Sequence, residues 1–328
     1  MSKLRITLAC SNYDRTHALL DGRVQPDGID LNYLSLPVEE TFFRMARFRE
    51  FDIAEMSLSS YTVSLNSDAK PFIAIPVFPS RFFRHSCIYI NRKAGIREPK
   101  DLIGKRVGTP EYQMTAPVWI RGILADEYDV PLDSVTYLTG GQEAPGRIEK
   151  GAISTRFEVT PIPPDRTLNE MLHAGEIDAF YGPRIPSSFG RGDGRVRRLF
   201  PDMVSAEKDY YASTGIFPIM HVVAVRREVY ERYPWVAQSL TKALDIAKNQ
   251  AYDRIYDASA LRFMEPWLMP HLEEARGLLG QDYWSYGLEA NRHVLDVFCR
   301  YHHDQGLSSR PRTADELFAP EATESFVI

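Results

Sequence analysis

The sequence has few cysteines, no long hydrophobic run and no excess of basic charge. Its three cysteines, Cys10, Cys87 and Cys299, are widely spaced and form no CxxC or Cys/His pattern, which argues against a disulfide framework or a structural zinc site. No stretch approaches the roughly 20 apolar residues that a membrane-spanning helix needs. The net charge of -5 argues against a nucleic acid or an anionic membrane as the partner. These absences leave a small molecule as the expected partner.

Targeting and cofactor signals are also missing. The chain begins MSKLRITLACSNYDRT, without an apolar stretch followed by a small-residue cleavage site, so we expect a cytoplasmic protein. It has no GxGxxG turn after a strand and no lysine in an evident Schiff-base setting, so a flavin, nicotinamide or pyridoxal cofactor is not expected. An HExxH metal motif is missing as well. A divalent metal stays open, because His85, Glu111 and His221 could converge in the folded chain.

What is present has the proportions of an ordinary globular protein. With 328 residues, 44% hydrophobic and 25% charged, the chain has enough material for two domains. Short apolar runs alternate with helical stretches, which is typical of α/β proteins with parallel sheets. We expect strands at residues 4–9, 29–36, 51–56, 72–77, 86–91, 106–109, 134–138, 177–181 and 219–225. We expect helices at residues 17–20, 37–48, 115–127, 168–173, 234–258, 265–279 and 284–302.

The order of these elements predicts two lobes whose chain crosses between them twice. Lobe 1 is expected to comprise residues 1–92 and 217–328, and lobe 2 residues 93–216. Ligands of open α/β sheets bind beyond the carboxyl ends of the strands, so a cleft between the lobes is the expected binding site.

Polar clusters follow the expected strand ends. They are Asn12, Tyr13, Asp14 and Arg15; Ser57, Ser59 and Ser60; Glu111, Tyr112, Gln113 and Thr115; and Tyr181 and Arg184. The serines read most simply as a helix cap, although a helix N-terminus also attracts anions. We expect these clusters to contribute substrate-binding side chains.

Arginines near the crossings suggest an anionic ligand. Arg81 and Arg84 flank the first crossing, and Arg121 lies on the first helix of lobe 2. An arginine fork pairs with a carboxylate through two parallel hydrogen bonds. Arg81 and Arg84 could equally be solvated or paired with Glu55 and Glu111, and an outward charge is the default for Arg121 on its helix.

Longer blocks of the chain resemble a known family. The patterns DLIGKRVGTPEY and GEIDAFYGP resemble the type II periplasmic-binding-protein fold, in its thiamine-precursor-synthesis-like branch. LACSNYDRT, FDIAEMSLSSY, PVFPSRFFRHSCIYIN and GTPEYQMTAPVWIRGIL resemble the 4,5-dihydroxyphthalate decarboxylase family. That resemblance implies loss of one carboxylate from 4,5-dihydroxyphthalate, an aromatic dicarboxylate, to give protocatechuate, with no organic cofactor.

Decarboxylation of an aromatic ring needs a proton donor at the carbon that loses carbon dioxide. A positioned general acid contributes about 10² to 10⁴ in rate. His85 and His221 are the candidates, since each lies beside a crossing, and His85 is favoured because arginines and serines surround it. Glu111 or Asp14 could accept a proton from the ring hydroxyl. His221, in the apolar run PIMHVVAV, could equally be a core residue.

Two other functions fit the same pattern. A solute-binding protein of an ABC transporter would use the arginines to capture an aromatic carboxylate without chemistry. A thiamine-pyrimidine precursor synthase would consume its own histidine and need iron, which the cysteine-poor sequence supports weakly. Aromatic residues in the C-terminal third leave a homo-oligomer open.

Overall fold

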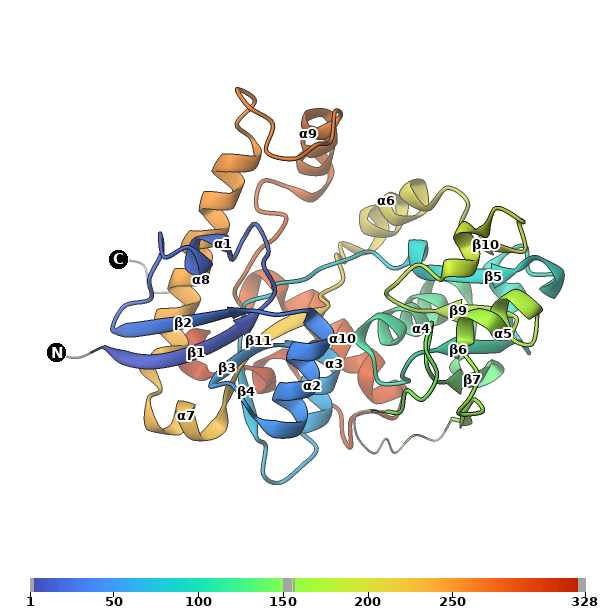
Figure 1. Ribbon diagram of the computed structural model, residues 1–328, viewed down its shortest axis with the longest axis horizontal. Coiled ribbons are helices and arrows are strands. Elements are labelled where there is room, and N and C mark those ends of the chain that lie inside the picture. Colours follow the sequence, from blue (N-terminus) through green and yellow to red (C-terminus); the bar gives the residue numbers. More distant parts are fainter. Residues whose placement is uncertain (1–2, 150–154, 156, 324–328) are drawn as a thin grey trace. The chain divides into compact units, whose positions relative to one another are not determined.

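The computed structural model describes residues 3–149, 155 and 157–323, which divide into two compact units (Figure 1). Unit 1 comprises Met1–Arg81, Ile219–Leu295 and Thr313–Ile328, and unit 2 comprises Phe82–Pro218 and Asp296–Arg312. Two lobes with a discontinuous first lobe were predicted. The first crossing lies eleven residues earlier than expected, after Arg81 instead of residue 92, and residues 296–312 belong to unit 2 instead of the first lobe.

Unit 1 is built on a five-stranded sheet in the order β2-β1-β3-β11-β4. β1, β2 and β3 run parallel, as expected, whereas β11 runs antiparallel to both β3 and β4, so the expectation of a parallel sheet is wrong for β11. Every residue of β3 is buried, as expected of a central strand. The strands are β1 (Leu4–Cys10), β2 (Ile29–Ser35), β3 (Ile53–Ser57), β4 (Phe72–Ile75) and β11 (His221–Arg226).

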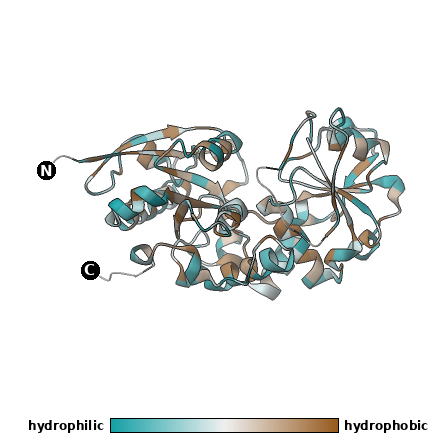
Figure 2. Cartoon of the chain, turned by 90° about the horizontal axis from the view of Figure 1, so that it is seen from below, coloured by the Kyte–Doolittle hydropathy of each residue, from teal (hydrophilic) through white to brown (hydrophobic). Residues whose placement is uncertain are grey.

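Helices pack beside this sheet through one apolar side. α2 buries Phe42 and Met45 and contacts β3, while α7 contacts β4 and β11. The helices in Figure 2 accordingly carry both hydrophobic and hydrophilic residues. Helices of unit 1 are α1 (His17–Leu20), α2 (Val38–Phe48), α3 (Leu58–Ser64), α7 (Arg227–Arg232), α8 (Trp235–Ile255) and α9 (Leu268–Leu279). α10 (Arg292–Asp304) starts in unit 1 and ends in unit 2. It begins eight residues later than expected, because Gly287 has a φ of 88°, which lies outside the α-helical range.

Unit 2 is built on a six-stranded sheet in the order β10-β5-β9-β6-β7-β8. β5 pairs antiparallel with β9 and β10, so residues 86–91 do not complete the first lobe as predicted. The strands are β5 (Ile88–Asn91), β6 (Arg106–Thr109), β7 (Thr136–Thr139), β8 (Val159–Pro161), β9 (Ala179–Tyr181) and β10 (Val196–Arg198). The helices are α4 (Thr115–Tyr128), α5 (Leu168–Ala174) and α6 (Met203–Thr214).

The core of unit 2 includes Leu168, Leu172, Ile177 and Phe180, which are all fully buried. α6 was not predicted, because only Tyr210 of its residues is buried and its sequence shows no apolar stripe. Among the described helices, none combines the length and hydropathy needed to cross a membrane.

Candidate active site

A buried glutamate in β3 organises the candidate site of unit 1. The Glu55 side chain is fully buried, and its Oε1 accepts hydrogen bonds from His221 Nδ1 at 2.6 Å and from Tyr13 Oη at 2.7 Å. Its Oε2 accepts from the Ser11 backbone N–H at 3.1 Å and from Cys10 Sγ at 3.5 Å. Burial alone would raise the pKa of the Glu55 carboxyl, but the hydrogen bonds and the nearby His221 hold that pKa below its usual value. Glu55 is therefore a carboxylate.

The sheet register explains why Glu55 meets His221. In the antiparallel pair of β3 and β11, His221 lies opposite Ser57 and Val223 lies opposite Glu55. Residues two apart in a strand share a face, so Glu55 and His221 are diagonal neighbours on the same face of the sheet.

His221 combines a fixed orientation with access to solvent. Because a carboxylate only accepts hydrogen bonds, the Nδ1 of His221 carries a proton, and Nε2 is the nitrogen left for chemistry. The Phe42 ring packs edge-on against the imidazole, at 4.8 Å between centroids, and the side chain of His221 remains 17% exposed. This arrangement suits a group that passes a proton.

The turn after β1 supplies a preorganised guanidinium. The Arg15 Cζ lies 4.1 Å from the centroid of the Tyr13 ring and 4.2 Å from that of the Trp284 ring. Arg15 Nε donates to the Pro79 carbonyl at 2.5 Å, and Nη1 pairs with Asp14 at 2.9 Å. The Arg15 side chain is 15% exposed, and it is linked to His221 through Tyr13 and Glu55. Its remaining N–H groups suit a carboxylate ligand.

Other predicted residues of unit 1 serve the scaffold. Arg81 is buried and its Nη2 donates to the Ser285 carbonyl at 2.7 Å and to Asn291 Oδ1, so it anchors the chain before α10. Ser57 Oγ accepts from the Ser60 N–H at 3.4 Å as the N-cap of α3, and Ser59 is buried. Asn12 is exposed and contacts His17.

In unit 2, the predicted proton donor His85 lies in apolar surroundings. Its side chain is 1% exposed, and the rings of Tyr128, Phe200 and Tyr210 lie 5.9, 5.1 and 5.2 Å from it between centroids. No described residue hydrogen bonds to either ring nitrogen. Burial lowers the pKa of His85 to about 4, so the imidazole is neutral near pH 7. Its surroundings therefore favour packing over proton transfer.

The cluster after β6 is held by ion pairs and backbone contacts. Glu111 is buried and pairs with Arg147 Nη2 at 2.7 Å. The Tyr112 backbone N–H donates to Glu149 Oε1, and burial is the main cause that raises the pKa of Glu149 to about 7. Gln113 and Thr115 are buried at the start of α4.

The remaining predicted arginines of unit 2 differ in environment. Arg121 is buried, with its Nε donating to Gln305 Oε1 at 2.7 Å and its guanidinium 3.9 Å from the centroid of the Tyr112 ring. Arg84 is buried and donates to Cys87 Sγ at 3.5 Å. Arg184 is exposed beyond β9, whose last residue Tyr181 is buried. Arg121 therefore holds the interior of unit 2 together, which the helix position alone did not indicate.

Comparison with known proteins identifies the family. No family model matches the chain. A 4,5-dihydroxyphthalate decarboxylase from Comamonas testosteroni is 45% identical over 330 residues, covering 100% of this chain and 100% of the relative. One from Pseudomonas putida is 45% identical over 213 residues, covering 64% of this chain and 83% of the relative. The chain belongs to the 4,5-dihydroxyphthalate decarboxylase family. The resemblance inferred from its sequence blocks is confirmed.

Solved structures confirm the fold of this decarboxylase family member. A periplasmic sulfonate-binding protein from Methylobacillus flagellatus KT matches with a TM-score of 0.55 at 13% identity, covering 98% of this chain and 93% of that one. The periplasmic aliphatic sulphonate binding protein SsuA from Escherichia coli matches with a TM-score of 0.53 at 11% identity, covering 98% and 99%. At such identities the matches show the two-lobe periplasmic-binding-protein fold and nothing about the ligand.

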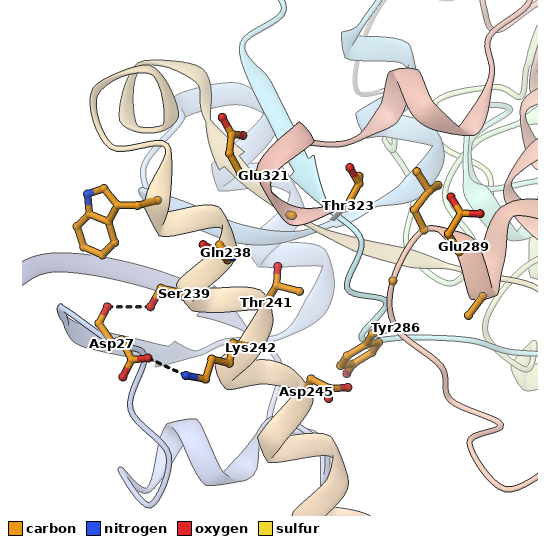
Figure 3. A pocket seen from close by; sticks show the side chains of 15 residues that line it. Asp27, Gln238, Ser239, Thr241, Lys242, Asp245, Tyr286, Glu289, Glu321 and Thr323 are labelled. Atoms are coloured by element: carbon orange, nitrogen blue, oxygen red, sulfur yellow. Dashed lines mark hydrogen bonds and ion pairs between the residues drawn. The ribbon is translucent and has the colours of Figure 1, made fainter. Parts of the chain in front are cut away.

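A separate pocket of about 850 Å³ lies in unit 1 of this 4,5-dihydroxyphthalate decarboxylase family member (Figure 3). Its wall includes α8 and the segment around Tyr286, and its single lysine, Lys242, pairs with Asp27 at 3.1 Å. Glu55 and His221 are not among its lining residues. Its wall carries four acidic side chains against one lysine and no histidine, so this pocket is a weaker candidate for binding a dicarboxylate and for proton transfer.

Metal ligation was left open by the sequence. Among the described residues, no group of three or more His, Cys, Asp or Glu side chains is arranged to hold a metal ion. Of the three proposed ligands, Glu111 contacts Arg147, His221 contacts Glu55, and His85 faces aromatic rings. These surroundings do not fit a shared ion.

Two members of the site in this family member were missed by the sequence reasoning. Glu55 was considered only as an ion-pair partner, and Trp284 only as one of the aromatic residues in the C-terminal third. One signal was available for Glu55, which stands as the single charged residue in the apolar run Ile53–Ser57. A charge in a central strand is expensive to bury without partners. No comparable signal pointed to Trp284, because its contact with Arg15 joins distant parts of the sequence.

Proposed function

We propose that the protein removes one carboxylate from 4,5-dihydroxyphthalate to give protocatechuate and carbon dioxide. Membership of the family, at 45% identity over the full chain, supports the reaction. The observation that carries the mechanism is the 2.6 Å hydrogen bond between buried Glu55 and partly exposed His221.

In the proposed step, His221 donates a proton from Nε2 to the ring carbon that bears the leaving carboxylate. The bond from that carbon to the carboxylate then breaks, its electron pair stays with the ring, and carbon dioxide leaves. The hydroxyl para to this carbon supplies electron density that favours its protonation. Water then returns a proton to Nε2, so the net reaction consumes one proton and releases one carbon dioxide.

Arg15 is proposed to bind the carboxylate that remains on the ring. Its guanidinium is already held by two aromatic faces, the Pro79 carbonyl and Asp14, so binding costs little side-chain entropy. Asp14 is engaged with Arg15, and Glu111 with Arg147, so neither is assigned here as the base for a ring hydroxyl.

We further propose that the reaction needs no organic cofactor and takes place in the cytoplasm. The absence of dinucleotide-binding and Schiff-base motifs from the sequence supports the first point. The three cysteines, free and buried, are consistent with a reducing compartment. Activity before and after treatment with a chelator, with divalent metals added back, tests whether a metal takes part.

The test compares purified wild type with His221→Asn. Asparagine keeps an N–H donor within reach of Glu55 but removes Nε2, so the interior stays satisfied while the proposed acid is lost. We expect wild type to convert 4,5-dihydroxyphthalate to protocatechuate and the variant to lose about 10² to 10⁴ in kcat. Affinity for phthalate, an unreactive analogue, should stay within about threefold of wild type when measured by calorimetry. This limit corresponds to roughly 0.6 kcal/mol in binding free energy.

Two outcomes would overturn this proposal. Tight binding of 4,5-dihydroxyphthalate by wild type without any protocatechuate, with or without divalent metal, would favour the solute-binding function that the fold also supports. Full activity of His221→Asn would remove His221 from the mechanism while leaving the reaction in place.

A further inference from the structure

The carboxylate of Glu55 uses all of its hydrogen-bonding capacity. Oε1 receives the two side-chain donors, His221 Nδ1 at 2.6 Å and Tyr13 Oη at 2.7 Å. Oε2 receives Ser11 N–H at 3.1 Å and Cys10 Sγ at 3.5 Å. A carboxylate has about four lone-pair sites. Four donors from two segments of the chain, residues 10–13 and His221, therefore leave Glu55 no freedom to rotate.

Glu55 carries the negative charge in the cluster that it forms with Cys10, Tyr13 and Tyr33. Its neighbours Cys10, Tyr13 and Tyr33 have pKa values raised above the ordinary range, chiefly by burial, and so remain uncharged near pH 7. The cationic side chains near it are Arg15 and, when protonated, His221. Removing the charge of a buried, fully bonded carboxylate would disturb every donor around it.

Tyr13 links this carboxylate to the guanidinium of Arg15. Its phenol donates to Glu55, while its ring face lies 4.1 Å from Arg15 Cζ. The second ring that holds Arg15 is that of Trp284. Its indole N–H donates to the Phe78 carbonyl at 3.0 Å, so this ring is fixed independently of Glu55. The tilt of the Tyr13 ring, and with it one of the two faces that hold Arg15, depends on the bond to Glu55.

We propose that Glu55 is a positioning residue that aligns both working groups of the site, His221 directly and Arg15 through Tyr13. This inference rests on the proposed function, in which His221 supplies the proton and Arg15 binds the remaining carboxylate. One buried carboxylate thereby couples substrate binding to proton transfer. Misplacement by about 1 Å can cost 10²-fold in rate, so a shared anchor has catalytic weight.

The experiment uses variants that separate the effect of Glu55 on substrate binding from its effect on proton transfer. Tyr13→Phe removes the phenol but keeps the ring beneath Arg15, His221→Asn removes Nε2, and Glu55→Gln removes the charge while keeping the shape. Binding of phthalate, measured by calorimetry, reports on Arg15, and kcat with 4,5-dihydroxyphthalate reports on His221. The ¹⁵N shifts of the His221 imidazole, assigned by comparison with His221→Asn, report its tautomer without any need for turnover.

Asp52 provides a matched control. It lies just before β3, and its carboxylate also joins β1 and β11, through the Thr7 N–H at 2.9 Å and Arg226 Nη2 at 2.9 Å. Asp52→Asn should lower stability without changing phthalate affinity or kcat, because it touches neither Tyr13 nor His221. It therefore measures what is lost when any carboxylate that ties these strands together is neutralised.

We expect Glu55→Gln to weaken phthalate binding about tenfold and to lower kcat about 10²-fold, with a changed imidazole tautomer. Tyr13→Phe should weaken phthalate binding about three- to tenfold, and it should lower kcat less than Glu55→Gln does, because it keeps the charge of Glu55. The inference would be overturned if Glu55→Gln changed phthalate binding and kcat no more than Asp52→Asn does. Unchanged phthalate binding in Tyr13→Phe would also overturn it. That second measurement decides the question if Glu55→Gln does not fold. If wild type turns over no acid, the proposed function fails, while phthalate binding and the imidazole spectra still judge Glu55.

Discussion

His85 illustrates how surroundings decide what a histidine does. Its ring lies edge-on to Tyr128 and Phe200 and is tilted against Tyr210. Burial lowers its pKa to about 4. An unfolded histidine has a pKa near 6.5. Between these two values the unfolded chain binds the proton and the folded chain does not. The folded state therefore loses stability as the pH falls from about 6.5 to about 4, by up to roughly 3 kcal/mol.

We predict that His85→Phe removes this acid sensitivity. Phenylalanine fills the aromatic surroundings without a titrating group, so urea unfolding at pH 7.5 and pH 4.5 should differ less for the variant than for wild type. Exposed His271, changed to Gln, is the control that should keep the wild-type difference. The variant should also keep its activity at pH 7.5. A folded His85→Phe protein that has lost about 10²-fold in kcat would restore His85 as the proton donor.

Glu149 makes the stability of the folded chain depend on pH in the opposite direction. Burial, with Glu111 nearby, outweighs the Tyr112 N–H and raises its pKa to about 7. The folded chain then keeps a proton that the unfolded chain loses above pH 4.5, so stability falls as the pH rises from about 4.5 to about 7. We predict that Glu149→Gln melts at a higher temperature than wild type at pH 8 and at nearly the same temperature at pH 4, whereas the exposed Glu158→Gln control differs little at either. A difference that does not change with pH would contradict this.

At this scale, the sequence indicated residue types better than residue roles. Arg15 and His221 could be predicted because both follow or begin strands whose ends collect polar groups. Glu55 could not be given a role, because its partners Tyr13 and His221 lie 42 and 166 residues away in the chain. The preference for His85 failed to anticipate its surroundings, because Phe200 and Tyr210 come from a segment whose helix was not predicted.

At the scale of elements, α4 shows how closely unit 2 is packed. Gly122 lies on α4 where the ring of Tyr301, from α10, occupies the space that a β-carbon would take. Arg121, the preceding residue, is bonded to Gln305, which follows α10. Glycine is thus required at position 122 by the neighbouring ring and not by its own backbone angle.

We predict that Gly122→Ala lowers the stability of unit 2 although alanine favours helices. Alanine gains about 1 kcal/mol in helix propensity, but the overlap with Tyr301 costs typically 1 to 3 kcal/mol. Exposed Gly277 in α9, which has open space around its β-carbon position, is the control whose change to Ala should stabilise. Urea unfolding of both variants checks this. Equal stabilisation by the two changes would show that α4 and Tyr301 separate at little cost.

Strands and helices with strong periodicity were predicted closely. β6 has the expected bounds Arg106–Thr109, and α4 is one residue longer than expected. Strand direction was not readable, since apolar runs such as those of β5 and β11 look alike in parallel and antiparallel pairs. Direction depends on which strands become neighbours, and that information lies in the whole sheet.

At the scale of the whole molecule, chain order explains both what was predicted and what was not. Alternation of strands and helices with two crossings indicated the two-unit fold, and the relatives confirm the family. The assignment of residues 296–312 to unit 2 could not be predicted from the sequence, because the apolar stripe of α10 continues past Leu295. The reaction itself followed from the family resemblance, whereas the roles of Arg15, Glu55 and His221 follow from the structure.

The most direct test of the central claim is the reaction of wild type with 4,5-dihydroxyphthalate in D₂O. We predict release of carbon dioxide and formation of protocatechuate with one deuterium at the carbon that lost its carboxylate, detected together by mass spectrometry and NMR. His221→Asn should form this product at least about 10²-fold more slowly. Binding of the acid without carbon dioxide release would contradict the assignment of this protein as a decarboxylase.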